Sequence, residues 1–132
     1  MTVERFAFAF DRRYAPVLAL LGIRAANSEV LLSDEMFDAR FGRLRCVTPV
    51  ANLKDVQVTR DYRAHRAIGP RGSLADHGAT FGTNTRAGAC VCFHEPVPAL
   101  VGRLGPHPAL TVTVEDPEAL AAAIRRRLTA SA

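Results

Sequence analysis

The sequence predicts an α+β fold built mainly of short antiparallel strands, with a single helix at the C-terminus. Many short segments alternate between apolar and polar residues, and turn residues separate them, which is typical of antiparallel strands. The last part of the chain instead repeats its apolar residues at helical spacing. A chain of 132 residues is near the usual size of one domain, so we expect a single domain over residues 1–132.

The first strand is predicted at residues 3–10, where phenylalanine recurs at every second position from Phe6 to Phe10. Side chains two residues apart point to the same face of a strand, so this spacing indicates one apolar face. The apolar segment that follows contains Pro16 near its start and ends in Gly22. Proline favours the first turn of a helix and glycine the position after its end, so a short helix is expected there.

Residues 28–60 are predicted to form a meander of short antiparallel strands. Residues 33–35 and 42–43 have the composition of tight turns. Pro49 interrupts the pattern, because proline has no N–H to donate to a neighbouring strand. Residues 55–60 alternate again and predict a further strand.

Residues 61–78 have no clear period and are rich in arginine, so we predict a long basic loop. Long loops in compact domains are often functional. Strands are predicted again within residues 79–114. Residues 84–88 are expected to form a hairpin loop, and the proline- and glycine-rich residues 95–108 a longer loop.

The C-terminal helix is predicted at residues 116–128. Asp116 is a good N-cap and Pro117 suits the first helical position. Residues 125–127 are three arginines, which favour the negative end of a helix dipole. The apolar stripe that would dock this helix comprises Leu120, Ala121, Ile124 and Leu128.

Composition and charge exclude bulk disorder. Apolar residues make up 48% of the chain and charged residues 23%, which are ordinary values for a globular protein. The net charge is +4, which permits anion binding but is also what a solvated basic surface would have. A charge of this size also permits nucleic-acid binding without implying it, and a nucleic-acid partner is not expected.

The cysteine content favours a reducing, cytoplasmic setting. The chain has three cysteines, whereas a secreted disulfide scaffold usually has more, in even number. Arg12 and Arg13 precede an apolar run at residues 15–23, which loosely resembles a signal peptide. Glu4 and Asp11 lie where that signal needs basic residues. The run is also far shorter than the about 20 residues that cross a bilayer, so no transmembrane segment is expected.

A set of short motifs, taken in order, resembles a known fold family. The motifs are VLLSDEM at 30–36, Phe41-Gly42, Val47 to Pro49, Ala51 to Leu53, LTVTV at 110–114 and DPEAL at 116–120. They resemble bacterial PH-like domains, and in particular actinobacterial proteins of this size. The resemblance covers residues 28–60 and 88–128. It implies a bent antiparallel barrel or sandwich of short strands, with the C-terminal helix covering one open end.

The resemblance implies a binding role and transfers no site residue. Members of the wider PH-like class bind lipid head groups, peptides or other protein domains, and few are enzymes. The matching motifs consist of turns, strands and a capped helix, so they carry no catalytic residue. Because one fold supports many functions, the site must be argued from its own residues.

Arg63, Arg66 and Arg71 are the candidate anion-binding residues of the basic loop. A guanidinium presents a planar fork of donors that matches phosphate or carboxylate. Gly69 and Gly72 would let backbone N–H groups approach the same anion. The alternative is a solvated loop whose arginines pair with nearby aspartates.

Cys90, Cys92 and His94 are the weak candidate metal ligands, because a strand would place all three on one face. Neighbouring positions on that face lie about 7 Å apart, so one strand cannot surround an ion without further ligands. Cys46 or His77 would have to supply them. The alternative is that the cysteines act as small apolar residues. No cofactor is predicted.

Catalysis is not expected from the sequence. No serine lies in a nucleophile elbow, and the adjacent Asp76 and His77 have turn composition before they resemble a catalytic pair. An enzyme would need a nucleophile, a base and an orienting group in contact. Residues 125–127 could meet nucleic acid or an acidic membrane, but complementing the helix dipole explains them more simply.

Three hypotheses of function follow from the sequence. The first is a small binding module of PH-like fold that recognises an anionic group or a partner protein through the basic loop. The second is a structural protein that forms homo-oligomers by pairing residues 3–10 with a second copy. The third is a metal or redox protein that uses Cys90, Cys92 and His94.

Overall fold

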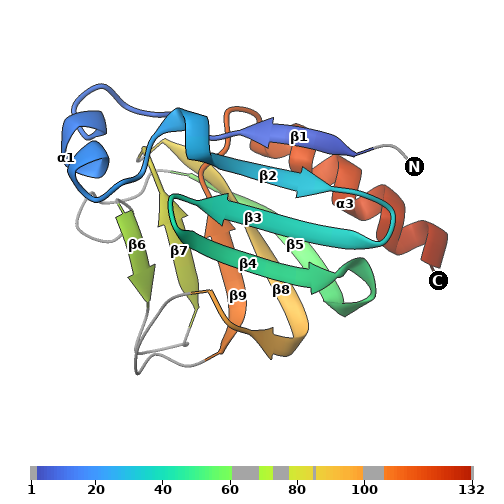
Figure 1. The fold of residues 1–132 in the computed structure, drawn as a ribbon. Coiled ribbons are helices and arrows are strands. Elements are labelled where there is room, and N and C mark those ends of the chain that lie inside the picture. The colour runs from blue at the N-terminus through green and yellow to red at the C-terminus, as the bar shows by residue number, and fades with distance from the viewer. Residues whose placement is uncertain (1–2, 61–68, 73–77, 85, 100–105, 132) are drawn as a thin grey trace.

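Two β-sheets face each other across an apolar core, and a C-terminal helix lies along one side of them (Figure 1). The computed structural model describes residues 3–60, 69–72, 78–84, 86–99 and 106–131. The first sheet has the antiparallel order β1-β2-β3-β4. Its strands are β1 (Glu4–Ala7), β2 (Ser28–Leu32), β3 (Met36–Phe41) and β4 (Leu44–Pro49).

The second sheet has the order β5-β8-β9-β7-β6. Its strands are β5 (Leu53–Arg60), β6 (Gly69–Gly72), β7 (Ala79–Gly82), β8 (Ala87–Val97) and β9 (His107–Val112). β7 and β9 run parallel, and the other neighbours in this sheet are antiparallel. The predicted α+β class with mainly antiparallel strands is therefore confirmed.

The core lies between the inner faces of the two sheets. Phe41 of β3 stacks on Phe81 of β7, with ring centroids 4.9 Å apart. Phe37 of β3 meets Phe93 of β8, with centroids 6.5 Å apart. These aromatic contacts join the sheets through side chains, and the inward-facing positions of β2 and β3 are buried beside them.

The described strands do not close into the barrel that the sequence left open as one outcome. Hydrogen-bonded ladders run within each sheet, and an isolated bridge between Phe8 and Val114 links the two at one corner. At the end of β4, Pro49 has no N–H, and the chain crosses to the other sheet through the 3₁₀ turn η2 (Val50–Asn52). The arrangement is a sandwich of two sheets.

The predicted basic loop differs from the structure at Gly69–Gly72, which form the edge strand β6. These residues pair with β7, Gly69 opposite Gly82 and Gly72 opposite Ala79. Glycine and proline have low strand propensity, but the free edge of β7 offers backbone partners that override it. Residues 61–68 and 73–77 of the predicted loop lie outside the described residues.

The N-terminal elements follow the predicted pattern in shortened form. β1 is shorter than the predicted strand, but Phe6, Phe8 and Phe10 all pack against the core, as their spacing indicated. The predicted short helix is α1 (Ala15–Leu20), with proline in its first turn. Gly22 follows its end with φ of +82°, a conformation that favours glycine. A second 3₁₀ turn, η1 (Ala25–Asn27), leads into β2.

The C-terminal helix α3 (Pro117–Ser131) begins where the sequence predicts and continues three residues beyond the predicted end at 128. Asp116 accepts a hydrogen bond from the N–H of Ala119 at 3.0 Å, so the predicted N-cap is confirmed. The buried side of the helix comprises Leu120, Ala121, Ala123 and Ile124.

The arginines of α3 do not lie at its C-terminal end, because the helix continues to Ser131. Arg125 donates to the carbonyl of Val56 at 2.8 Å. Arg127 donates to the carbonyl of Ser33 at 3.0 Å and pairs with Glu4 at 2.9 Å. Dipole complementation was therefore the wrong explanation of these residues, which fasten the helix to both sheets. No helix among the described residues is long and apolar enough to cross a membrane.

Candidate functional site

The loop residues predicted to bind an anion cannot be placed as a group. Arg63 and Arg66 lie outside the described residues. Arg71 lies in β6 opposite Thr80 of β7. Their joint role therefore stays a prediction, and two other concave, charged surfaces occur among the described residues.

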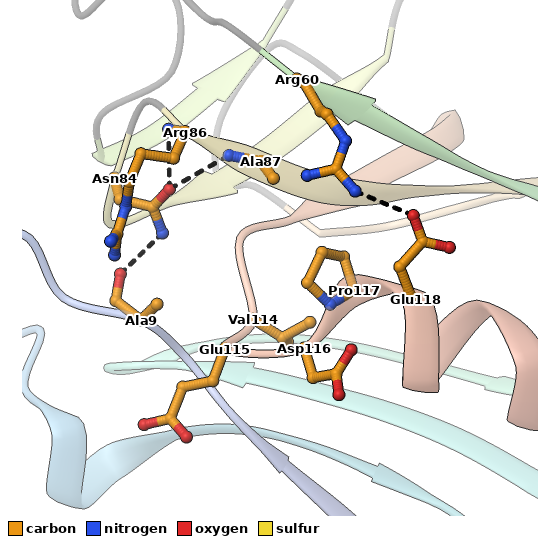
Figure 2. A pocket seen from close by; sticks show the side chains of 10 residues that line it. All are labelled: Ala9, Arg60, Asn84, Arg86, Ala87, Val114, Glu115, Asp116, Pro117 and Glu118. Carbon is orange, nitrogen blue, oxygen red and sulfur yellow. Dashed lines mark hydrogen bonds and ion pairs between the residues drawn. The ribbon is translucent and has the colours of Figure 1, made fainter.

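The first hollow lies where the end of β1, the turn before β8 and the start of α3 meet (Figure 2). We call it the helix-end hollow, and its volume is about 330 Å³. The residues that line it are Ala9, Arg60, Asn84, Arg86, Ala87, Val114, Glu115, Asp116, Pro117 and Glu118.

Asn84 holds the helix-end hollow together. Its side-chain N–H₂ donates to the carbonyl of Ala9 at 2.7 Å, and its oxygen accepts from the N–H of Arg86 at 2.9 Å and of Ala87 at 3.3 Å. Asn84 is buried, so these bonds satisfy a polar group that would otherwise be costly. The side-chain amide of Asn84 already makes its hydrogen bonds to the backbone, so it is not available to bind a ligand.

The charges of the helix-end hollow argue against an anion there. Arg60 already pairs with Glu118 at 2.9 Å (Figure 2). Two further carboxylates, Glu115 and Asp116, line the same hollow, and Arg86 is the other cation on its wall. An anion would therefore meet three carboxylates and two arginines, which gives no net attraction.

The second hollow lies over the outer side of the hairpin formed by β3 and β4. We call it the arginine hollow, and its volume is about 490 Å³. The residues that line it are Ala26, Asn27, Glu29, Arg40, Gly42, Arg43, Leu44 and Arg45.

The register of the hairpin places the arginines together. Arg40 and Arg45 are directly opposite each other in the antiparallel ladder. Their neighbours Ala39 and Cys46 are buried in the core, so strand alternation puts both arginines on the outer face. Arg43 lies in the turn between the strands.

Gly42 makes the tight turn beside Arg43 possible. Its φ is +63°, and a Cβ at this position would lie 2.9 Å from Cγ1 of Ile23 and 3.1 Å from the carbonyl of Gly22. Only glycine fits both the conformation and the space. The arginine hollow is thus supported on the segment that follows α1.

Asp38 orients two of the three arginines. Its carboxylate accepts from Nε and Nη2 of Arg45 at 2.9 and 2.7 Å, and from Nε of Arg40 at 3.2 Å. Burial penalises the charged carboxylate, but these hydrogen bonds and the positive charges outweigh it, so the pKa of Asp38 is lowered. The same contact raises the pKa of Arg45. The paired guanidiniums are held in place while a large part of each side chain stays exposed.

The arginine hollow carries net positive charge. Glu29 is occupied by Arg5 at 3.6 Å, and Asp38 is shared by Arg40 and Arg45. Arg43 has no ion pair within the part of the chain that the structure describes, and it is exposed. A free guanidinium beside two oriented ones is the donor set that binds a phosphate or carboxylate group. This site was not predicted from the sequence, although arginines on both sides of a glycine turn were a visible signal.

The candidate metal ligands share one strand as predicted. Cys90 and Cys92 are half-buried on β8, and His94 is exposed beyond them. Cys46 is fully buried in the other sheet, and His77 lies outside the described residues. No group of three or more histidine, cysteine or acidic residues that could hold a metal occurs within the ranges that the structure describes.

Two of the described thiols, Cys46 and Cys92, are poorly suited to nucleophilic chemistry. Burial, with the negative charge of Asp38 nearby, raises the pKa of Cys46 to about 12. Burial also raises the pKa of Cys92 to about 12, with contributions from Asp55 and Cys90. The thiolate is the reactive form, so both groups are protonated and weakly reactive at neutral pH.

Ser28 and Ser33 have structural hydrogen-bond partners, and none of these partners is a base. The hydroxyl of Ser28 donates to Oδ1 of Asn27 at 3.2 Å. The hydroxyl of Ser33 accepts from the N–H of Met36 at 3.0 Å in the turn between β2 and β3. Asp76 and His77 lie outside the described residues. Nothing in the described geometry combines a nucleophile with a base and an orienting group.

Comparison with known proteins assigns no family: no family model, no curated protein and no solved structure matches the chain. The resemblance to PH-like domains therefore stays a prediction, and the candidate site stands on its own geometry.

Proposed function

We propose that the protein is a small binding module that recognises an anionic group, on a ligand or on a partner protein, through the arginine hollow. The observation that carries the proposal is the arrangement of Arg40, Arg43 and Arg45 around a hollow of about 490 Å³. Asp38 neutralises part of this charge and at the same time holds two guanidiniums in one orientation. Pre-oriented donors lose little freedom on binding, which favours recognition over diffuse attraction.

The other expectations from the sequence concern the fold family, the location, a second anion site and homo-oligomers, and none of them depends on the arginine hollow. A PH-like fold and a cytoplasmic location are parts of the proposal that came from the sequence. Arg63, Arg66 and Arg71 of the basic loop are a second candidate anion site, to be tested by substitution in the same assay. Homo-oligomer formation through residues 3–10 stays an alternative, because β1 is an edge strand of its sheet, although Phe6, Phe8 and Phe10 pack against the core. Arg126 and Arg127 also reach Glu4 at 3.6 and 2.9 Å.

The test is a titration of the protein with inorganic phosphate and with pyrophosphate, followed by amide chemical shifts and by calorimetry. We expect saturable binding with shifts at the β3–β4 turn. Arg43→Gln should weaken it roughly tenfold, because a hydrogen bond to a charged group contributes about 1.5–3 kcal/mol. Arg86→Gln is the matched control, since it removes an exposed arginine from the helix-end hollow.

The proposal fails if the wild-type protein binds neither anion. It also fails if Arg43→Gln leaves the affinity unchanged while Arg86→Gln lowers it, because the site would then lie at the other hollow.

A further inference from the structure

The most exposed large apolar side chains of the described residues gather at α1. Leu20 is 88% exposed, Leu21 62% and Val17 57%. We call these three residues the apolar tip. Single exposed leucines are common on protein surfaces, but three on one short segment form a patch that calls for an explanation.

The apolar tip is anchored by buried residues and hydrogen bonds of its own segment. Leu18 and Ile23 of the same segment are buried in the core, and the N–H of Ile23 donates to the carbonyl of Leu18 at 2.9 Å. The side chain of Asn27 donates to the carbonyl of Gly22 at 2.8 Å. Buried residues therefore anchor the segment to the core, and its exposed apolar side chains face the solvent.

Basic residues flank the apolar tip on both sides in sequence. Arg12, Arg13 and Arg24 are all exposed, and Asp11 is the one carboxylate in residues 11–24. Asp11 is already paired with Arg13 at 3.2 Å. The segment thus combines apolar side chains with a net positive collar.

The apolar tip also adjoins the arginine hollow. The turn at Gly42 lies against Gly22 and Ile23, and Ala26 and Asn27 line the hollow itself. In Figure 1, α1 and the turn between β3 and β4 lie at the same end of the sandwich. The tip and the hollow are therefore neighbours at one end of the molecule.

The size of the tip decides between a protein and a membrane as its occupant. A stable protein interface needs roughly 800 Å² from each partner, and three side chains offer well below that. A bilayer accepts a small apolar tip, because lipids close around it, and anionic head groups attract a basic collar.

We infer that the protein docks on anionic membrane surfaces. Val17, Leu20 and Leu21 enter the boundary between head groups and acyl chains, and Arg12 and Arg24 contact the head groups. The arginine hollow then receives an anionic head group. The inference rests on the proposed function in this last respect, because it identifies the source of the anion as a lipid.

The experiment is flotation of the full chain with two kinds of vesicle, one of phosphatidylcholine alone and one that also contains phosphatidylglycerol. We expect binding to the anionic vesicles only, weakened by added salt. Leu20→Ser combined with Leu21→Ser should lower the vesicle affinity about tenfold or more, because less apolar surface is buried. Arg12→Gln with Arg24→Gln should lower it as well. Both doubles change exposed residues, so folding should persist, and circular dichroism checks this.

A matched control separates the tip from apolar surface in general. Met36→Ser with Val47→Ser removes two other exposed apolar side chains, on the outer face of the first sheet, and should leave vesicle binding unchanged. Equal binding by the Leu20 and Leu21 variant and the wild type would overturn the inference. Self-association abolished by that variant would overturn it in favour of a second copy of the chain.

The phosphate titration distinguishes the two proposals. Binding of pyrophosphate without binding of either vesicle would overturn the membrane inference and leave the proposed function in place. If the protein bound neither pyrophosphate nor the vesicles, the membrane inference and the proposed function would both be overturned. Vesicle binding that needs the tip but persists in Arg43→Gln would retain membrane docking and overturn the role of the hollow in it.

Discussion

Replacing Asp38 by asparagine tests whether this carboxylate is what orients the arginines. Asp38→Asn keeps the shape of the side chain but removes the charge that Arg40 and Arg45 share. The carboxylate side chain is 11% exposed, whereas those of Arg40 and Arg45 are 43% and 55% exposed. Charge-assisted hydrogen bonds contribute about 1.5–3 kcal/mol, and solvent screening of the arginines reduces this. We therefore expect the free energy of unfolding to fall by about 1–2 kcal/mol at neutral pH.

The same substitution has a predictable pH dependence. The folded-state pKa of Asp38 is lowered, so the ionised carboxylate stabilises the folded state. This contribution is fully present above the unfolded-state pKa of about 3.9, and it is lost as the pH falls through the lower, folded-state value. The difference between wild type and Asp38→Asn should be constant at neutral pH and shrink in acid.

Urea denaturation at a series of pH values measures both effects. Glu29→Gln is the control, because its exposed pair with Arg5 at 3.6 Å should contribute no more than about 0.5 kcal/mol. A loss at Asp38→Asn no larger than that of the control, or a loss that does not change in acid, would refute the orienting role of the carboxylate.

Two further predictions concern the turn and a thiol. Gly42→Ala should lower the free energy of unfolding by about 2 kcal/mol or more, and Gly22→Ala by about 1 kcal/mol. Both glycines have positive φ, but only Gly42 lacks space for a Cβ. Equal losses in urea denaturation would contradict the steric argument. Cys46 should resist iodoacetamide in the folded protein even when the pH is raised to about 9, because its pKa is about 12 and its side chain is buried, and it should react once urea unfolds the chain. Rapid labelling under native conditions, located by mass spectrometry, would show that the thiol is accessible.

Local chemistry made the ends of the chain predictable. Asp116 and Pro117 define the start of α3 by themselves, because an N-cap and a first-turn proline act within a few residues. The phenylalanines from Phe6 to Phe10 likewise showed their buried face through a period of two. Such signals need no knowledge of the rest of the fold.

Two of the strand pairings were not predictable from local composition. β6 exists because β7 has a free edge, although Gly69–Gly72 have a loop-like composition. The predicted hairpin loop at residues 84–88 was also wrong, because β7 pairs in parallel with β9, which separates it from β8. The paired strands β7 and β9 are far apart in the sequence, and β6 pairs with its neighbour β7 against its own composition, so local propensity could not reveal either pairing.

For the candidate site, too, some properties were predictable from the sequence and others depended on the tertiary structure. The sequence by itself determined that the chain is a mainly antiparallel α+β protein with a capped C-terminal helix and an excess of arginine, because composition, period and capping are local properties. The tertiary structure decided which arginines act together. Register set Arg40 opposite Arg45, Asp38 joined them, and the packing of Gly42 on the segment after α1 brought the apolar tip beside them. Charge at a surface depends on which strands are neighbours, and that is settled only when the two sheets bury their shared core.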